Sequence, residues 1–248
     1  MKIVALPSED LKENLSKETH WEKAAKTRMG KYLTQLESKF ILKSVDLSRE
    51  NLTVMDVGAE AGRFSLIAAE NNATVVSIDI DSYSLKRLKA KTNQVNIIQA
   101  DARKLPLKDG VLDAAFMIEV LDYIPELDLA LKDCNRTLKN DGFCILSFGN
   151  KSSLKAKIRK VHGKSYLHSY GTVMHSLFEA GFTLKRQMGY SWLPFGRVSE
   201  NRFVPVLAWF ERFFGLRRIT RFSPWVIMYL VNNQDSKSHS ISFLESHK

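Results

Sequence analysis

The pattern of hydrophobic and polar positions changes its period near residue 50. In residues 8–44, apolar side chains such as Leu33, Leu36 and Phe40 recur at helical spacing. This pattern predicts N-terminal helices within residues 1–45. The stretch DLSREN, at residues 46–51, then supplies turn-forming residues before the new period begins.

From residue 52 onward, short apolar runs alternate with amphipathic helical segments. The predicted strands are residues 52–57, 73–80, 95–100, 112–118 and 142–148, the last entered by the turn LKNDG. Strands that are apolar throughout and are separated by helices are typical of a parallel sheet covered on both faces. The sequence therefore predicts an α/β, doubly wound core over residues 46–150.

The regularity loosens after residue 150. Residues 151–222 form a predicted basic, substrate-side cap region, in which the segment KSSLKAKIRKVHGK contains six basic residues and no acid. Within this region we expect a helix at 170–181, a strand at 182–190 and an aromatic-rich helix at 204–215. A last strand at 223–233 and a tail at 234–248 complete one single domain of residues 1–248.

The net charge of +10 is distributed unevenly over the 248 residues. Residues 1–150 contain 21 Lys and Arg against 22 Asp and Glu, whereas residues 151–248 contain 16 against 5. Such an excess favours an anionic partner: a nucleic acid, a membrane surface or an acidic substrate. The alternative is that the basic side chains only solvate a helical surface.

Composition adds three expectations about the setting of the protein. Two cysteines, Cys134 and Cys144, have no metal-type spacing, so we expect no metal site and a reduced, cytoplasmic location. The apolar runs are too short to span a bilayer, and the N-terminus is a poor signal peptide. A membrane-peripheral location is compatible with the basic C-terminal part.

Three carboxylates fall at the ends of three consecutive predicted strands: Asp56, Asp79 and Asp101. In an open parallel sheet the carboxyl ends of the strands line the ligand crevice. The first carboxylate opens the glycine loop DVGAEAGRFS, and Asp79 lies 21 residues after Gly58. An acid at this spacing accepts hydrogen bonds from ribose hydroxyls, so the predicted ligand contains a ribose.

Glu60 restricts which ribose compound the loop can hold. A dinucleotide loop of the form G-x-G-x-x-G needs glycines where this chain has Glu60 and Arg63. At about 4 Å and an effective dielectric of about 20, each contact of a carboxylate with a phosphate charge costs on the order of 4 kcal/mol. This disfavours NAD and FAD. S-adenosylmethionine has no phosphate and is cationic, so it is compatible with an acidic crevice.

At these residues the chain resembles the class I S-adenosylmethionine-dependent methyltransferases. The matching stretches are VMDVGAEAG, which lacks only the middle glycine of the family motif, then SIDID, QADARKLPLKDGVLDAAF and EVLDYIPELDLALKDCNRTLKNDGFCILSF. The resemblance covers roughly residues 30–150. It implies a Rossmann-like methyltransferase fold, with a mostly parallel seven-stranded sheet that ends in an antiparallel pair at 182–190 and 223–233.

The resemblance also implies the residues that bind S-adenosylmethionine. They are Asp56, Gly58, Glu60, Gly62, Asp79, Ile80, Asp101, Ala102 and Glu119. By this resemblance Asp79 binds the ribose, Asp101 meets the adenine, and Glu119 lies near the transferred methyl. For Glu60 we keep three alternatives: a solvated loop side chain, a contact with the cofactor's ammonium group, or a damaged site.

The segment after the fourth strand bears on the acceptor. It lacks the N/D-P-P-Y/F stretch of enzymes that methylate exocyclic amines of nucleic-acid bases, and EVLDYIP is closer to the E-x-L-x-H pattern of small-molecule methyltransferases. Tyr123 stands where those often have His. It joins His162 and His168 as a substrate-side candidate, and no catalytic residue is assigned. Three interpretations of the aromatic helix stay open: contact with a membrane, a wall of a hydrophobic substrate pocket, or packing against the sheet.

The resulting hypothesis is a methyltransferase that uses S-adenosylmethionine and acts on a small-molecule or lipid-like acceptor. One alternative is an RNA methyltransferase that binds through the basic C-terminal part. The other is a non-catalytic protein that retains the fold.

Overall fold

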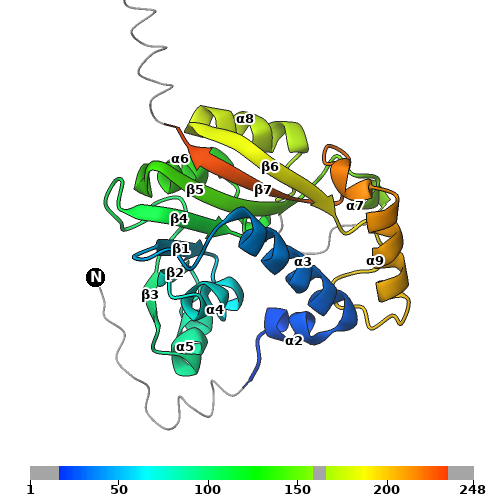
Figure 1. Cartoon of the computed structure of the whole chain (residues 1–248), viewed down its shortest axis with the longest axis horizontal. Coiled ribbons are helices and arrows are strands. Elements are labelled where there is room, and N and C mark those ends of the chain that lie inside the picture. Colours follow the sequence, from blue (N-terminus) through cyan, green and yellow to red (C-terminus); the bar gives the residue numbers. More distant parts are fainter. Residues whose placement is uncertain (1–16, 159–165, 234–248) are drawn as a thin grey trace, which may run out of the picture.

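A central seven-stranded sheet organises the chain in the computed structural model, which describes residues 17–158 and 166–233 (Figure 1). The strand order is β3-β2-β1-β4-β5-β7-β6. The strands are β1 (Thr53–Val57), β2 (Thr74–Asp79), β3 (Val95–Gln99), β4 (Leu112–Met117), β5 (Leu138–Gly149), β6 (Phe182–Tyr190) and β7 (Trp225–Asn232). β1 to β5 are parallel and β7 is antiparallel to both β5 and β6, which confirms the predicted doubly wound, mostly parallel sheet.

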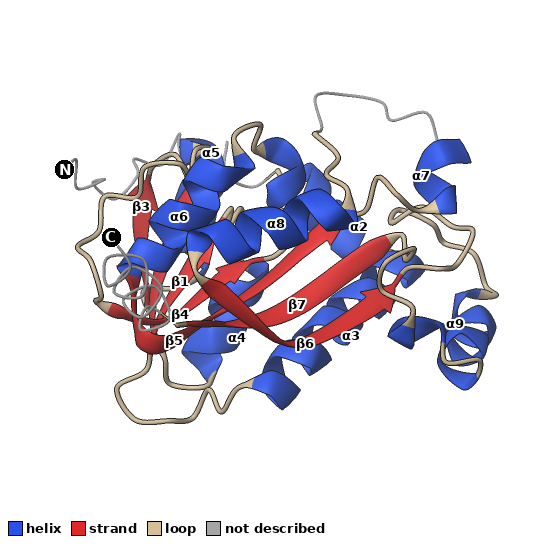
Figure 2. Cartoon of the chain, turned by 90° about the horizontal axis from the view of Figure 1, so that it is seen from above, coloured by secondary structure: helices blue, strands red, loops and turns tan. Residues whose placement is uncertain are grey.

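Helices cover both faces of this sheet, α6 and α8 on one side and α3 and α4 on the other (Figure 2). The helices are α2 (His20–Lys26), α3 (Arg28–Ser44), α4 (Arg63–Glu70), α5 (Ser82–Lys91), α6 (Leu127–Thr137), α7 (Leu154–Ile158), α8 (Tyr170–Ala180) and α9 (Val204–Phe213), with the short 3-10 helices η1 (Leu121–Tyr123) and η2 (Leu216–Arg218). Successive strand residues such as Val54 and Met55 are both fully buried because each face has its own hydrophobic core. No described helix is long and apolar enough to cross a membrane.

Local signals in the sequence explain several element ends. Asp81 caps α5, because its carboxylate accepts hydrogen bonds from the backbone N–H groups of Tyr83 and Ser84. Gly181 ends α8 in the left-handed conformation, with φ at 92°, as its position predicted. Pro205 lies in the first turn of α9, where a missing N–H has no cost.

One predicted boundary was wrong, and one predicted helical region divides into two helices. The helical region at 8–44 is not continuous, because Thr27 leaves the helical conformation, ends α2 and caps α3 through a hydrogen bond from Gly30 N. Residues 1–16 lie outside the described part of the chain. The fifth strand begins at Leu138 rather than at 142, since Leu138 already pairs with Leu112 and a register shift follows before Ala114.

Candidate active site

A cavity of about 840 Å³ opens at the carboxyl ends of β1, β2 and β4. Its lining includes residues 58–61 and 63 of the glycine loop, Asp79, Ile80 and Trp21 of α2, whereas the predicted site residue Gly62 is buried and is not part of the lining. The segment after β4, including Tyr123, forms a further wall. Ligand pockets of small-molecule enzymes have volumes of roughly 300–1,000 Å³, so this cavity can hold a cofactor and part of an acceptor.

Two positions in the loop require glycine. Gly58 has a φ of 70° and Gly62 a φ of 89°, both in the left-handed region. A Cβ at Gly58 would lie 2.4 Å from Val120 Cγ2, and one at Gly62 would lie 2.2 Å from Leu88 Cδ1. The Gly58 N–H donates to Ile78 O at 2.8 Å, which ties the loop to β2. Glycine at these two positions therefore lets the side chains of Val120 and Leu88 pack directly against the loop backbone.

The side chain of Glu60 forms part of the wall of this cavity. Its φ is 49°, so it adopts the conformation that a glycine would adopt, and its backbone N–H donates to Asp79 Oδ2 at 2.8 Å. One carboxylate oxygen accepts a hydrogen bond from Ala61 N at 2.7 Å. The other, Oε1, is buried and has no hydrogen-bond partner among the described residues. Glu60 is thus half-buried rather than a solvated loop side chain.

Asp79 is held at the end of β2 by two backbone groups. Oδ2 accepts from Glu60 N, and Oδ1 accepts from Asp81 N at 2.9 Å. Each carboxylate oxygen keeps a further lone pair available to a ligand. Ile80, next in the chain, is 70% exposed and lines the cavity, which leaves an apolar side chain free beside the carboxylate.

Asp101 and Ala102 lie beside this site, on the loop that follows β3. They line a smaller adjoining cavity of about 130 Å³ whose wall also includes Asp79. The Asp101 carboxylate accepts hydrogen bonds from the Arg103 guanidinium, which lowers the pKa of Asp101. Arg103 also pairs with Glu126. The strand spacing therefore brings Asp79 and Asp101 to the same small cavity. The Arg103 guanidinium already binds the Asp101 carboxylate.

Asp56 is buried beneath the loop at the end of β1. Its Oδ2 accepts a hydrogen bond from Ser65 Oγ at 2.6 Å, and Ser65 Oγ accepts one from Ser77 Oγ at 2.8 Å. Burial raises the pKa of Asp56 to about 6, against the lowering effect of the Ser65 bonds. This chain of hydroxyls joins β1, α4 and β2 directly under the glycine loop.

Glu119 belongs to a buried network of four alternating charges. It lines the cavity, and its carboxylate pairs with Arg63 at 2.8 Å and closely with Arg197. Glu37 of α3, fully buried, pairs with Arg197 at 3.2 Å and Arg63 at 3.6 Å and accepts a hydrogen bond from Tyr190. Desolvation lowers the pKa of Arg197 to about 10. The Glu119 carboxylate is thus bound by two arginines at the end of the cavity.

The sequence gives little sign of this network. Arg63 and Arg197 are 56 and 78 residues from Glu119, and Glu37 lies on a helix that precedes the predicted core. The single local signal is that Arg63 directly follows the last glycine of the loop. Pairs between such distant elements depend on the assembled fold.

α2 closes the cavity from the N-terminal side. Glu22 pairs with Arg87 at 2.8 Å and with Lys91 at 2.7 Å, both on α5. Lys91 also donates to Ala61 O in the glycine loop at 2.7 Å. Although burial raises the pKa of Glu22, hydrogen bonds from the two basic groups lower it to about 2. These contacts connect α2 to the opposite side of the cavity.

The three substrate-side candidates have different outcomes. Tyr123 is half-exposed and lines both cavities. The ring of His168 contacts Leu121 O and Ile124 O, each at 3.2 Å, so it supports the η1 segment and is not among the residues that line these cavities. His162 lies outside the described residues.

Asp122 was not singled out in the sequence. It is buried beside Gly149, whose N–H donates to its carboxylate at 3.1 Å. Burial raises the pKa of Asp122 to about 7, although the Gly149 hydrogen bond acts in the opposite direction. Within residues 17–158 and 166–233 we find no group of side chains that could hold a metal ion.

The chain is similar to known methyltransferases. A family model described as a methyltransferase domain matches residues 55–146. The sterol 4-C-methyltransferase strm-1 of Caenorhabditis elegans is 31% identical over 144 residues, which are 55% of this chain and 43% of that protein. The malonyl-[acyl-carrier protein] O-methyltransferase of Geobacter sulfurreducens is 29% identical over 150 residues, covering 54% and 56%. This chain thus spans about half the length of the curated relatives it matches.

A solved structure of another protein has the same fold as this chain. The magnesium protoporphyrin IX methyltransferase from Synechocystis, with bound S-adenosylhomocysteine, superposes with a TM-score of 0.60 at 17% identity, covering 90% of this chain and 94% of that one. The fold is Rossmann-like, and the strand ends form an acidic crevice. Over this core the chain is similar to S-adenosylmethionine-dependent methyltransferases, and one solved structure of the same fold holds S-adenosylhomocysteine.

Proposed function

We propose that this protein transfers a methyl group from S-adenosylmethionine to a small-molecule or lipid-like acceptor. The observation that carries the proposal is the position of Asp79 at the end of β2, beside a glycine loop that lines the cavity. In this proposal Asp79 accepts hydrogen bonds from the ribose hydroxyls and Ile80 packs on the adenine. The loop at Gly58 lies along the methionine part, and Gly62 supports the loop from beneath.

The charges of the cavity support a cationic cofactor. Asp56, Asp79 and Glu60 all line it, and Glu60 Oε1 has no hydrogen-bond partner within the described residues. A buried acceptor without a donor costs about 1–3 kcal/mol, which an ammonium group can recover. S-adenosylmethionine carries an ammonium and a sulfonium, so it supplies what this carboxylate lacks.

Methyl transfer mainly requires that the acceptor atom lies in line with the sulfur–methyl bond. The cavity lining includes the apolar side chains of Trp21, Ile118 and Val120, which favour an apolar acceptor. Burial raises the pKa of Tyr123, and the charge of Asp122 adds to this effect, so the Tyr123 phenol stays protonated near neutral pH. We therefore assign Tyr123 the role of orienting the acceptor by a hydrogen bond rather than that of a base.

Calorimetric titration of the full chain with S-adenosylmethionine and S-adenosylhomocysteine tests the cofactor. Each hydrogen bond from a ribose hydroxyl to a charged carboxylate contributes about 1.5–3 kcal/mol. We expect Asp79→Ala to weaken binding at least a hundredfold. Asp109→Ala, which removes an exposed acid paired with Arg136, serves as the control and should bind normally. Folded wild-type protein that binds neither compound would exclude the proposal.

The basic C-terminal part favours RNA as a second candidate acceptor. One of its lysines is already engaged within the protein, since Lys155 Nζ donates to Leu193 O at 2.6 Å and to Phe195 O at 3.0 Å. RNA binding should weaken steeply with added salt. Incubation with labelled S-adenosylmethionine and extracts separated into lipid, small-molecule, RNA and protein pools distinguishes the acceptors. If no pool is labelled, the non-catalytic alternative is favoured.

A further inference from the structure

The segment from residue 203 to residue 222 exposes an apolar surface of unusual extent, which we call the α9 surface. Its members are each 41–67% exposed: Phe203, Val206, Trp209, Phe210, Phe213, Phe214, Ile219 and Phe222. α9 lies at the outer rim of the molecule, away from the faces of the sheet (Figure 1). Contiguous apolar patches on a soluble protein mark interaction sites more often than isolated apolar residues do.

A buried acid fixes the orientation of this helix. Glu211 is 1% exposed, and its carboxylate accepts hydrogen bonds from Tyr32 OH at 3.1 Å, Trp192 N at 3.2 Å and Arg217 Nε at 3.2 Å. Arg217 also donates to the Tyr32 hydroxyl at 3.0 Å. The side of α9 that is bound to the body of the protein carries this acid together with Val204, Leu207 and Ala208, which pack against the core. These contacts hold the opposite, aromatic side of the helix outward.

The aromatic side chains are ordered by contacts with one another. The rings of Trp209 and Phe213 stack with their centroids 4.9 Å apart, and those of Phe210 and Phe214 stack at 5.8 Å. Both pairs have the i, i+4 spacing of neighbours on a helix. The α9 surface is thus a preformed pair of aromatic rows along the outer side of the helix.

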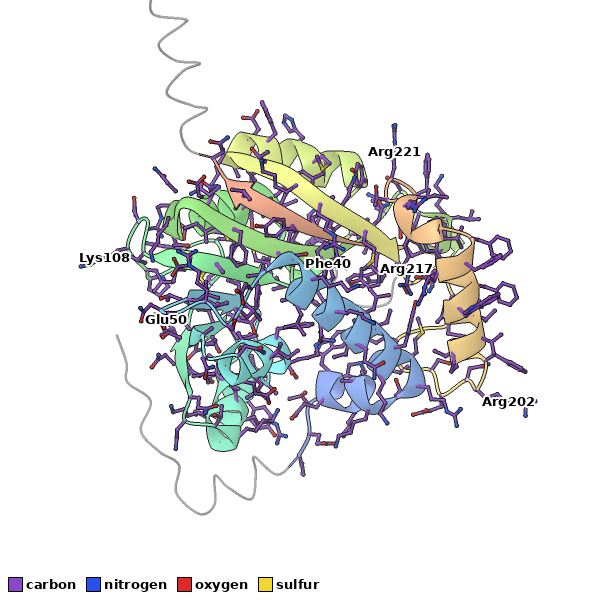
Figure 3. The ribbon with its side chains drawn as sticks, in the orientation of Figure 1. Phe40, Glu50, Lys108, Arg202, Arg217 and Arg221 are labelled. Atoms are coloured by element: carbon purple, nitrogen blue, oxygen red, sulfur yellow. The ribbon has the colours of Figure 1, made fainter. Side chains whose placement is uncertain are left out.

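Arginines flank this surface in excess over acids, and Glu211 pairs with Arg217 alone among them. Residues 201–222 contain five arginines and one acid, the buried Glu211. The Arg202 guanidinium lies 5.0 Å from the Phe203 ring centroid, and that of Arg221 lies 5.9 Å from the Phe222 ring centroid. Figure 3 shows Arg202 and Arg221 pointing away from the molecule, whereas Arg217 points toward its interior.

The α9 surface lies at the same end of the sheet as the cavity. Tyr190, the last residue of β6, pairs with Trp225 of β7, which in turn pairs with Gly149 at the carboxyl end of β5. The cavity opens at the carboxyl ends of the parallel strands of that sheet. A planar partner that contacts α9 would therefore approach the end of the molecule that contains the cavity.

We propose that the α9 surface docks onto a lipid bilayer that contains anionic lipids. Trp, Phe, Val and Ile side chains enter the boundary between head groups and acyl chains, and the surrounding arginines pair with anionic head groups. Nucleic-acid interfaces are more polar than this surface. A two-fold contact between copies would place the same arginines against each other, which like charges disfavour.

Cosedimentation of the full chain with vesicles tests this proposal without any cofactor, so its result is independent of the proposed methyl transfer. The probes are vesicles of phosphatidylcholine alone and of phosphatidylcholine mixed with phosphatidylglycerol. We expect wild-type protein to bind the mixed vesicles. The double variant W209S/F213S should lose at least tenfold in affinity.

A matched control is available on α8. Phe178 is 75% exposed and lies near the start of β6, at the opposite end of that strand from α9, so Phe178→Ser should bind like the wild type. An arginine near an anionic surface contributes about 1 kcal/mol, so R202Q/R221Q should lose roughly 25-fold on the mixed vesicles. Circular dichroism and thermal unfolding confirm that each variant is folded.

Three outcomes would overturn the proposal. Wild-type protein fails to bind the mixed vesicles, or W209S/F213S binds them as well as Phe178→Ser does. In the third, vesicle binding is absent and sedimentation velocity shows a concentration-dependent dimer that W209S/F213S abolishes. That result would make α9 a contact between copies of the chain.

Discussion

Charged side chains are paired around the cavity and mostly unpaired on the α9 surface, although both lie at the same end of the sheet. Around the cavity, Arg63 and Arg197 are matched by two buried glutamates, Glu37 and Glu119, within a single network. At α9 the one acid, Glu211, is turned inward and the outer arginines face solvent. Paired charges can hold a wall rigid around a small ligand. Unpaired charges around an apolar surface remain free for an extended partner.

The largest expected effect tests the paired side of this comparison. Glu37→Gln removes one charge from the network and leaves Arg197 buried with less compensation. Breaking a buried ion pair in this way costs about 3–5 kcal/mol of the free energy of unfolding, which urea denaturation measures. The control is Glu50→Gln at an exposed position, expected to change stability by less than about 0.5 kcal/mol. Equal stabilities of the two variants would show that the network contributes little.

This network also shows which parts of the molecule could be predicted. The strands of the core were located to within one or two residues, apart from the start of β5, because buried parallel strands are continuous apolar runs. The acids at the strand ends follow from the same pattern. Glu37 gave no such signal, since its burial depends on arginines that other elements supply. Pairs across the fold have no local periodicity.

α9 shows a different limit of prediction from the sequence. Its helix and its early proline were expected, but the sequence left open whether its aromatic side packs against the sheet, and the structure excludes that packing. Helical periodicity identifies an apolar side and assumes that this side is buried. Here the buried side combines Val204, Leu207 and Ala208 with Glu211 and its three hydrogen bonds, and a second apolar side remains exposed.

A smaller effect, with a pH dependence, is expected at Asp122, where the η1 segment contacts β5. Its pKa is about 7 in the folded protein and about 4 in an unfolded chain. The folded state therefore holds the proton more tightly, and this contribution to stability is full below about pH 4 and lost as the pH rises through about 7. Asp122→Asn stays neutral, so its stability relative to the wild type should rise by on the order of 3 kcal/mol between about pH 5 and about pH 8.

Thermal or urea unfolding at about pH 5 and about pH 8 measures this difference. Asp109→Asn, at an exposed position, provides the comparison and should show no such trend. A constant difference between Asp122→Asn and the wild type at both pH values would mean that Asp122 is ionised in the folded protein.

The contact of α2 with α5 should have a moderate effect on ligand release. Glu22→Gln weakens the pairs with Arg87 and Lys91 that connect the two sides of the cavity. We expect S-adenosylhomocysteine to dissociate about tenfold faster, equivalent to about 1.4 kcal/mol. Glu200→Gln alters an exposed acid that pairs with Arg28 outside the cavity lining and should leave the rate unchanged. Identical rates for both variants, measured by stopped flow, would show that α2 does not retain the ligand.

Glu60 offers the finest test, because its two expected effects have opposite signs. Replacement by glycine relieves a left-handed conformation that costs other residues about 1–2 kcal/mol, less the added freedom of the unfolded chain. Glu60→Gly should therefore be more stable by up to about 1 kcal/mol. If Oε1 meets the cofactor's ammonium group, the same variant should bind S-adenosylmethionine several-fold more weakly. Higher stability with unchanged affinity would instead mean that the cavity only tolerates this acid. The two measurements together therefore show whether the strained conformation of Glu60 serves ligand binding or has no role.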